Sequence, residues 1–146
     1  MQNDCGVVYN RTMNFPYFSQ NGQLKPMSEA VVPLSDINFQ YGFGVYETMK
    51  IRKKVLFFVD QHVDRLMKSA EIIGLEHPFK PEKIIEYIRD LIEANLIESA
   101  NIKMLLIGGR TPEESNLYIL PLAPLYPDRK LYSDGAIVST VVYERF

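Results

Sequence analysis

The sequence predicts an α+β fold, a two-layer sandwich in which two helices pack on one face of a mainly antiparallel sheet. Segments with strand-like alternation come first along the chain, two segments with helical periodicity follow, and strand-like segments then return. The 146 residues are 47% hydrophobic and 23% charged, which is typical of a globular chain with one sizeable core. The same composition excludes disordered and fibrous proteins.

The first third of the chain is predicted to be β-structure. Residues 15–20 and 23–25 flank Asn21-Gly22, a pair that readily takes the positive φ angles of a type I′ turn, and so predict a hairpin. The stretch from Asp36 to Tyr41 predicts a turn or a short helix. From Gly44 to Ile51 the side chains alternate, which predicts a strand. One face of that strand carries Val45, Glu47, Met49 and Ile51.

A second hairpin and two helices are expected next. Arg52-Lys53-Lys54 is expected to turn the chain into an apolar strand from Val55 to Val59. The first helix has Asp60 as its predicted N-cap and Gly74 as its stop, and the second opens at Pro81, which suits a first helical position. Apolar stripes at helical spacing comprise Val63, Leu66, Met67, Ala70 and Ile73, and then Ile84, Ile88, Leu91 and Ile92.

The last third returns to β-structure. Strands are expected from Asn101 to Ile107, from Leu117 to Leu120 and from Gly135 to Tyr143. We assign residues 1–134 to one small domain and residues 135–146 to a strand that leads out of it.

Charge and cysteine content narrow the function classes. The net charge is −2 and the isoelectric point about 5.7, so no basic surplus points to nucleic acid or to an anionic membrane. Cys5 is the single cysteine, which excludes an internal disulfide and a zinc site built on cysteines. No apolar run approaches the roughly 20 residues of a membrane span, and the N-terminus lacks the shape of a signal peptide. We expect a cytoplasmic domain.

Three segments could carry chemistry, and each has an ordinary structural alternative. Gly42 and Gly44 lack side chains and would let the backbone approach another molecule or another part of the chain closely. The alternative is that they form the tight turn that leads into an edge strand. The two glycines do not match the Gly-x-Gly-x-x-Gly pattern of a dinucleotide-binding site, because the third glycine is missing and no helix opens there. Lys103 lies in an apolar strand, where it faces either a wet cleft or open solvent.

The third segment is helical. His62 and Arg65 are three residues apart and therefore neighbours on one helix face, where the guanidinium could bind a phosphate or carboxylate. The alternative is a solvated face with an Asp64–Lys68 ion pair. Neither His62 nor His77 has an obvious carboxylate or cysteine partner in the sequence, so no metal site and no Ser-His-Asp triad is predicted.

These segments match a known family in their order and spacing. Residues 32–36 (Val-Pro-Leu-Ser-Asp), 39–48 (Phe-Gln-Tyr-Gly-Phe-Gly-Val-Tyr-Glu-Thr), 61–66 (Gln-His-Val-Asp-Arg-Leu) and Ser69-Ala70 resemble class IV pyridoxal-phosphate enzymes. That family contains branched-chain and D-amino-acid aminotransferases and aminodeoxychorismate lyases. The resemblance covers nearly the whole chain but corresponds to the family's small N-terminal domain and the start of the crossover to the large cofactor domain.

The resemblance implies that the full-length parent transfers an amino group between an amino acid and a 2-oxo acid, uses pyridoxal phosphate and forms a homodimer. It assigns the cofactor phosphate to Arg65, the arginine of a His-x-x-Arg-Leu motif. Tyr41, Tyr46 and Glu47 match the substrate side of the pocket. Lys103 falls where some relatives have a pocket arginine.

Two positions depart from the family pattern. Phe43 stands between the two glycines, where an acidic or small residue is usual. Gly108 stands where several relatives carry an arginine, and Arg110 is displaced by two, so no contact to a substrate carboxylate is assigned there.

The catalytic lysine is expected beyond Phe146. In the family this lysine binds the cofactor covalently, shuttles a proton and follows an arginine that Arg145 resembles. No lysine of the chain matches it, so we expect the 146-residue chain to bind little or no cofactor and to be inactive alone. Two alternatives stay open: the parent is an aminodeoxychorismate lyase, or the chain is a stand-alone domain that dimerises or binds a ligand without catalysis.

Overall fold

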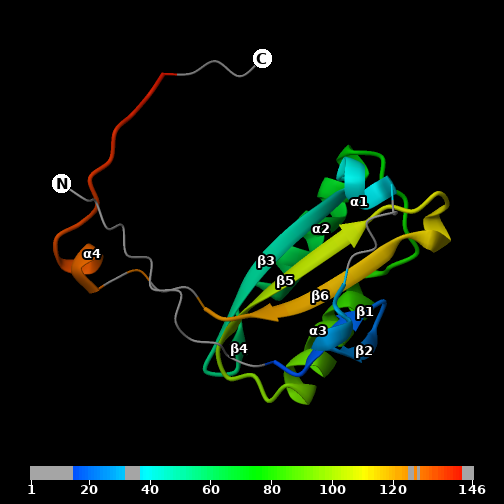
Figure 1. The fold of residues 1–146 in the computed structure, drawn as a ribbon, viewed down its shortest axis with the longest axis horizontal. Helices are drawn as coiled ribbons and strands as arrows, with labels where there is room; N and C mark the ends of the chain where they lie inside the picture. Colours follow the sequence, from blue (N-terminus) through cyan, green and yellow to red (C-terminus); the bar gives the residue numbers. More distant parts are fainter. Residues whose placement is uncertain (1–14, 32–36, 125–126, 128, 143–146) are drawn as a thin grey trace. The chain divides into compact units, whose positions relative to one another are not determined.

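A computed structural model describes residues 15–31, 37–124, 127 and 129–142 (Figure 1). Its strands are β1 (Tyr17–Gln20), β2 (Gln23–Pro26), β3 (Gly44–Arg52), β4 (Val55–Leu56), β5 (Ala100–Ile107) and β6 (Asn116–Leu122). Its helices are α1 (Ile37–Tyr41), α2 (Val59–Ile72), α3 (Pro81–Ala94) and α4 (Arg129–Ser133), with short 3₁₀ turns η1 (Met27–Glu29) and η2 (Pro112–Glu114). The described residues up to Pro124 belong to one compact unit and the later ones to another. No helix in the described ranges has the length and apolar character of a membrane span.

The six strands form one sheet in the order β2-β1-β6-β5-β3-β4, with every neighbouring pair antiparallel. α2 and α3 cover the same face of this sheet (Figure 1). β4 pairs only with the last two residues of β3, so the preceding part of β3 is an edge of the sheet. The predicted two-layer α+β sandwich is confirmed.

The core lies between the sheet and the two long helices. Every second residue of β5 is buried, because successive side chains of a strand point to opposite faces. The helices contribute stripes at three- and four-residue spacing, as predicted, except that Ile73 follows the end of α2 and is 44% exposed. Their buried residues are Val63, Leu66 and Ala70 on α2, and Ile84, Ile88 and Leu91 on α3. Removing these side chains from water, at about 25 cal/mol per Å² of apolar surface, is what holds the layers together.

Both predicted hairpin turns are present. Asn21 and Gly22 join β1 to β2 with φ angles of 54° and 85°, the left-handed pair of a type I′ turn. Lys53 and Lys54 join β3 to β4 with φ angles of 50° and 63°. The left-handed conformation raises the free energy of a residue that has a Cβ by roughly 1–2 kcal/mol. Because both central residues of the second turn are lysines, that turn is strained, and the sequence did not indicate this strain.

The strand predicted from Val55 to Val59 is too long. β4 ends at Leu56, because Phe58 takes a left-handed conformation with φ 53° and α2 starts at the next residue. Phe58 is therefore the N-cap in place of Asp60, which lies in the first turn, where its carboxylate still favours the helix dipole. Gly74 follows the end of α2 with φ 70°, as its predicted role requires.

The strand predicted from Gly135 to Tyr143 is not formed. Residues 135–142 follow α4 without regular secondary structure. A strand needs a neighbouring strand to satisfy its N–H and C=O groups, and no strand among the described residues pairs with this segment. The domain boundary at residue 134 stays a prediction. Cys5, residues 32–36, Tyr143 and Arg145 lie outside the described residues.

Two buried serines offer a matched test of this core. Ser19 on β1 is 1% exposed and its hydroxyl has no hydrogen-bond partner in the described part of the chain. Ser115 is 2% exposed, donates to the carbonyl of Glu76 at 2.9 Å and accepts from the N–H of Gly109 at 3.3 Å. Because a lone buried hydroxyl is unfavourable and a bonded one is not, we expect Ser19→Ala to raise the free energy of unfolding by up to about 1 kcal/mol. Ser115→Ala should lower it by about 2 kcal/mol.

Urea denaturation of the two variants beside the parent chain measures both values. Equal destabilisation by the two substitutions would show that the Ser19 hydroxyl is bonded in solution.

Candidate functional site

The packing of α2 on β3 brings together three side chains that are far apart in the sequence. Glu47 lies on the helix-facing side of β3, as the predicted alternation requires. His62 and Arg65, one turn apart on α2, both contact its carboxylate. The predicted helix-face neighbours thus have a carboxylate partner after all, on a strand.

The Glu47 carboxylate holds Arg65 through two parallel hydrogen bonds. Arg65 Nε donates to Oε1 and Nη2 donates to Oε2, each at 2.7 Å. His62 Nδ1 lies 2.7 Å from Oε2 and 3.1 Å from Arg65 Nη2. Since a carboxylate only accepts and a guanidinium only donates, we assign the proton to Nδ1, donating to Glu47.

Burial differs sharply across this cluster. The side chains of Glu47 and His62 are 12% and 19% exposed, whereas that of Arg65 is 63% exposed. The hydrogen bonds from Arg65 lower the pKa of Glu47, burial partly opposes that shift, and the hydrogen bond from His62 adds to it. Glu47 in turn raises the pKa of Arg65. The guanidinium is anchored on one side, and its Nη1 group has no hydrogen-bond partner among the described residues.

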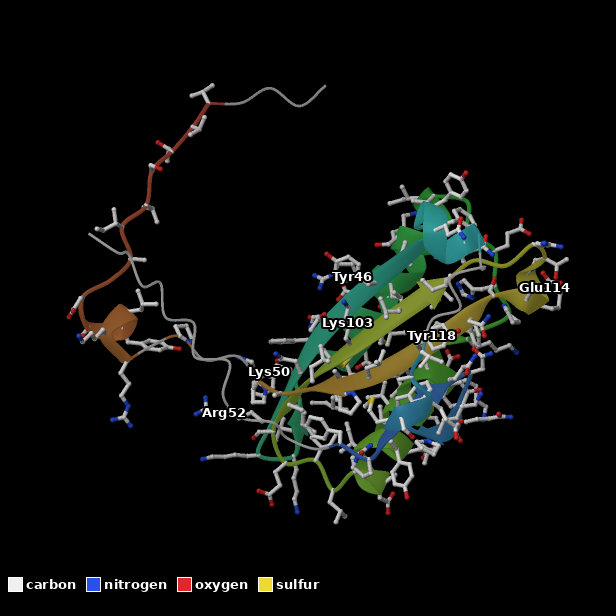
Figure 2. The ribbon with its side chains drawn as sticks, viewed as in Figure 1. Tyr46, Lys50, Arg52, Lys103, Glu114 and Tyr118 are labelled. Atoms are coloured by element: carbon white, nitrogen blue, oxygen red, sulfur yellow. The ribbon has the colours of Figure 1, made fainter. Side chains whose placement is uncertain are left out.

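Tyr46 and Lys103 form a second group on the opposite face of the sheet. The Lys103 ammonium lies 5.3 Å from the centroid of the Tyr46 ring, within reach of a cation–π interaction. Figure 2 shows the two side chains next to each other on β3 and β5. Tyr46 is 68% exposed, so its ring and the lysine face solvent.

The candidate residues therefore do not form one cluster. Strand alternation puts Tyr46 and Glu47 on opposite faces, so Glu47 does not lie beside Tyr46 as the pocket assignment implies. Tyr41, the last residue of α1, is 81% exposed and has no hydrogen bond or ring contact with the others in the described part of the chain. The sequence did not single out His62 as a partner of Glu47, because their proximity depends on how α2 packs.

One alternative drawn from the sequence is corrected. The Asp64–Lys68 ion pair is not formed, because Lys68 donates to Glu71 at 2.8 Å instead. The Nδ1 of His77 accepts a hydrogen bond from the backbone N–H of Phe79 at 3.2 Å, and burial lowers the pKa of His77.

The two departures from the family pattern touch each other. The ring of Phe43 covers Gly108 so closely that a Cβ built there would collide with it. The N–H of Gly108 also donates to the carbonyl of Phe43 at 3.0 Å. Position 108 therefore has no room for a side chain while the ring stays in place.

The ion pairs of Glu47 predict a stability that depends on pH. A folded-state pKa below the ordinary 4.5 means that the stabilisation is complete above about pH 5 and is lost as the pH falls through the folded-state value. Glu47→Gln should lower the free energy of unfolding by about 1–2 kcal/mol at pH 7, and the difference from the parent chain should shrink below pH 4.5.

Urea unfolding from pH 3 to pH 8 tests this, with Glu71→Gln as the control. That residue makes an exposed ion pair, so its substitution should have little effect at any pH. A Glu47→Gln difference that does not change with pH would contradict the assigned ion pairs.

Comparison with known proteins gives one consistent family. The sequence pattern of class IV amino-transferases matches residues 44–145. A D-alanine aminotransferase from Bacillus licheniformis is 32% identical over 94 residues, which are 64% of this chain and 33% of that protein. A probable branched-chain-amino-acid aminotransferase from Rickettsia bellii is 35% identical over 103 residues, 70% of this chain and 36% of that protein.

The fold agrees with this sequence match. The solved structure of a branched-chain amino acid aminotransferase from Escherichia coli is similar with a TM-score of 0.67 and 25% identity, over 74% of this chain and 41% of that one. This chain spans about a third of the length of the curated relatives that it matches. Since the family pattern covers most of the sequence, the chain belongs to the class IV aminotransferase family.

Proposed function

We propose that this chain is the small N-terminal domain of a pyridoxal-phosphate-dependent aminotransferase and that Arg65 binds the cofactor phosphate. The observation that supports the proposal is the Arg65 guanidinium, which Glu47 fixes on one side and which is open to solvent on the other. The family uses pyridoxal phosphate, and a phosphate with close to two negative charges favours a fixed, permanently charged donor.

The donor set fits a phosphate. Nη1 of Arg65 offers N–H groups that no described residue uses. Glu47 and His62 hold the guanidinium without covering it, so the role of Glu47 in this proposal is to position Arg65. When bound, pyridoxal phosphate would supply an aldehyde carbon that can carry the amino group from one acid to the other, and an electron-withdrawing ring that stabilises the negative charge developing on the substrate.

Tyr46 and Lys103 are proposed to face the substrate. An ammonium held over an aromatic ring can pair with a carboxylate, the group that every amino acid and 2-oxo acid carries. The exposed ring of Tyr41 is assigned to the same side by the family resemblance. The relatives named above act on D-alanine or on branched-chain amino acids, so both classes are candidate substrates of the parent enzyme, which we expect to be a cytoplasmic homodimer.

The 146 residues alone are expected to be inactive. They match about a third of each relative's length, and none of their lysines stands at the position expected for the catalytic lysine. The substrates, stereochemistry and partners of the parent are therefore part of this proposal.

Two measurements on the purified chain test the proposal. Pyridoxine phosphate and pyridoxine, which lack the aldehyde and cannot react with surface lysines, isolate the phosphate contact. We expect pyridoxine phosphate to bind weakly, with a Kd in the millimolar range, and Arg65→Gln to raise that Kd at least about fivefold without affecting pyridoxine. Arg89→Gln, an exposed arginine on α3, serves as the control. An unchanged Kd in Arg65→Gln would contradict the phosphate assignment.

The second measurement is turnover. With pyridoxal phosphate, 2-oxoglutarate and either D-alanine or L-leucine, the 146-residue chain should form no glutamate. A cofactor absorbance band together with turnover would refute the expected inactivity.

A further inference from the structure

The turn between β1 and β2 contains the one asparagine of the sequence that is followed by a glycine. This pair is Asn21-Gly22, and every other asparagine of the chain precedes a residue with a side chain. Asparagine loses its side-chain amide most readily in this context, because glycine has no side chain to hinder the attack of its backbone nitrogen. Asn21 is therefore the asparagine of this chain whose local sequence most favours deamidation.

The reaction needs only these two residues and water. The Gly22 nitrogen attacks Cγ of Asn21, the bond from Cγ to Nδ2 breaks, and the amide nitrogen leaves as ammonia with the proton of the Gly22 N–H. Water then opens the resulting five-membered imide at either of its carbonyl carbons, which gives aspartate or isoaspartate. Asn21 is exposed, so water is available for this second step. The rate depends on whether the turn lets the nitrogen and Cγ meet.

The folded chain holds the Asn21 amide away from Gly22. Its oxygen accepts from the N–H of Leu117 at 2.8 Å, and its Nδ2 donates to Oδ1 of Asn116 at 3.0 Å. Both partners are on β6, which lies on one side of β1, whereas Gly22 leads into β2 on the other side. Cγ must turn toward Gly22 to react, so these hydrogen bonds must break first.

The backbone of the turn is also held in place. The N–H of Asn21 donates to the carbonyl of Leu117 at 2.9 Å. Gly22 lies against the ring of Tyr87 on α3, so closely that a Cβ built on Gly22 would collide with that ring. Figure 1 shows the β1–β2 hairpin beside α3. The turn is thus held between β6 and α3, and the Gly22 nitrogen has little freedom to approach the Asn21 side chain.

The product of deamidation does not fit the contacts that Asn21 makes. Aspartate has an oxygen in the place of Nδ2, and this oxygen would face Oδ1 of Asn116, which is also an acceptor. Turning the Asn116 amide over does not remove the conflict, because its Oδ1 also accepts from Gln20 Nε2 at 3.1 Å and its Nδ2 donates to the carbonyl of Glu114 at 3.0 Å. Isoaspartate adds a carbon to the backbone, which is incompatible with a two-residue type I′ turn.

We propose that Asn21 is a deamidation site that the folded chain keeps unreactive, and that its conversion loosens the β1–β2 hairpin from β6. Conversion then proceeds through molecules in which the hairpin has opened locally. It does not reverse, because the ammonia is lost, so a converted molecule keeps a weakened hairpin. The turn follows β1, which β6 and β5 separate from β3. The inference therefore does not depend on the proposed function of Arg65.

The rate of conversion in the folded and the unfolded chain tests the first part. The 146-residue chain is incubated at pH 8 with and without concentrated urea, and mass spectrometry of its peptides gives the converted fraction of residue 21. A peptide of residues 17–26 in both buffers corrects for the effect of urea itself. We expect conversion to be at least about tenfold slower in the folded chain, because the hydrogen bonds to β6 must first break. Equal rates in the folded and the unfolded chain would overturn the inference.

Asn116→Ala identifies the restraint, because it removes the acceptor of the Asn21 Nδ2 group. It should speed conversion about fivefold in the folded chain and leave the rate in urea unchanged. Asn101→Ala is the matched control: it removes an asparagine of β5, opposite Lys50 and Leu122, and should change neither rate. Circular dichroism checks that both variants are folded. An unaltered folded-state rate in Asn116→Ala would contradict the assigned restraint.

Asn21→Asp tests the second part without any deamidation. We expect its urea midpoint to lie below that of the parent chain. The same substitution made in Asn116→Ala should lower the midpoint clearly less, because the opposing oxygen is then absent. No loss in the parent chain, or a loss of equal size in both backgrounds, would show that conversion does not loosen the hairpin in this way.

Discussion

The burial of α2 against β3 is the constraint on which both the fold and the candidate site depend. Val63 and Leu66 of α2 share one core with Met49 and Ile51 of β3. That core fixes the rotation of the helix about its axis, because its apolar stripe has only one direction in which it can be buried. Once the rotation is fixed, the flank of α2 beside the stripe must face the outer end of the Glu47 side chain. The polar cluster is thus positioned by apolar packing.

The same strand divides two kinds of chemistry between its faces. A carboxylate on the helix face lies close to the core, where it is tolerated because a guanidinium and an imidazole both donate to it. The next residue toward the N-terminus, Tyr46, points to a face on which the described strands carry cations and neutral groups and no carboxylate. Adjacent residues of β3 therefore contribute to two different environments, one on each face of the strand. Because the part of β3 that carries them is a sheet edge, both environments lie near one border of the sheet.

Patterns with a local cause were predicted well from the sequence. The Asn-Gly turn, the proline start of α3, the glycine after α2 and the alternation of β3 each depend on a few neighbouring residues. The apolar stripes of the two long helices could also be predicted, because the spacing of their apolar residues follows from the geometry of the helix itself.

Features with a distant cause were not predicted. The early end of β4 follows from the left-handed Phe58, a conformation that no local rule assigns to phenylalanine. The strand expected after Gly135 lacks a described partner, and pairing is a long-range property. His62 and Arg65 are 15 and 18 residues from Glu47 in the sequence. Their contacts with Glu47 follow from how α2 packs on β3, which the sequence alone does not give. The family resemblance grouped Glu47 with Tyr46 by sequence adjacency, whereas the pleat of the strand separates them.

The contact between Phe43 and Gly108 has a consequence for how this sequence can change. Any side chain at position 108 must displace an aromatic ring from its place over the backbone and expose it further to water. A smaller residue at position 43 would not collide with a side chain at position 108. Glycine at position 108 leaves room for the ring of Phe43. A side chain at position 108 is therefore compatible with this backbone only where residue 43 is smaller than phenylalanine or its ring is displaced. Positions 43 and 108 are therefore coupled, and the effect of a substitution at one depends on the residue at the other.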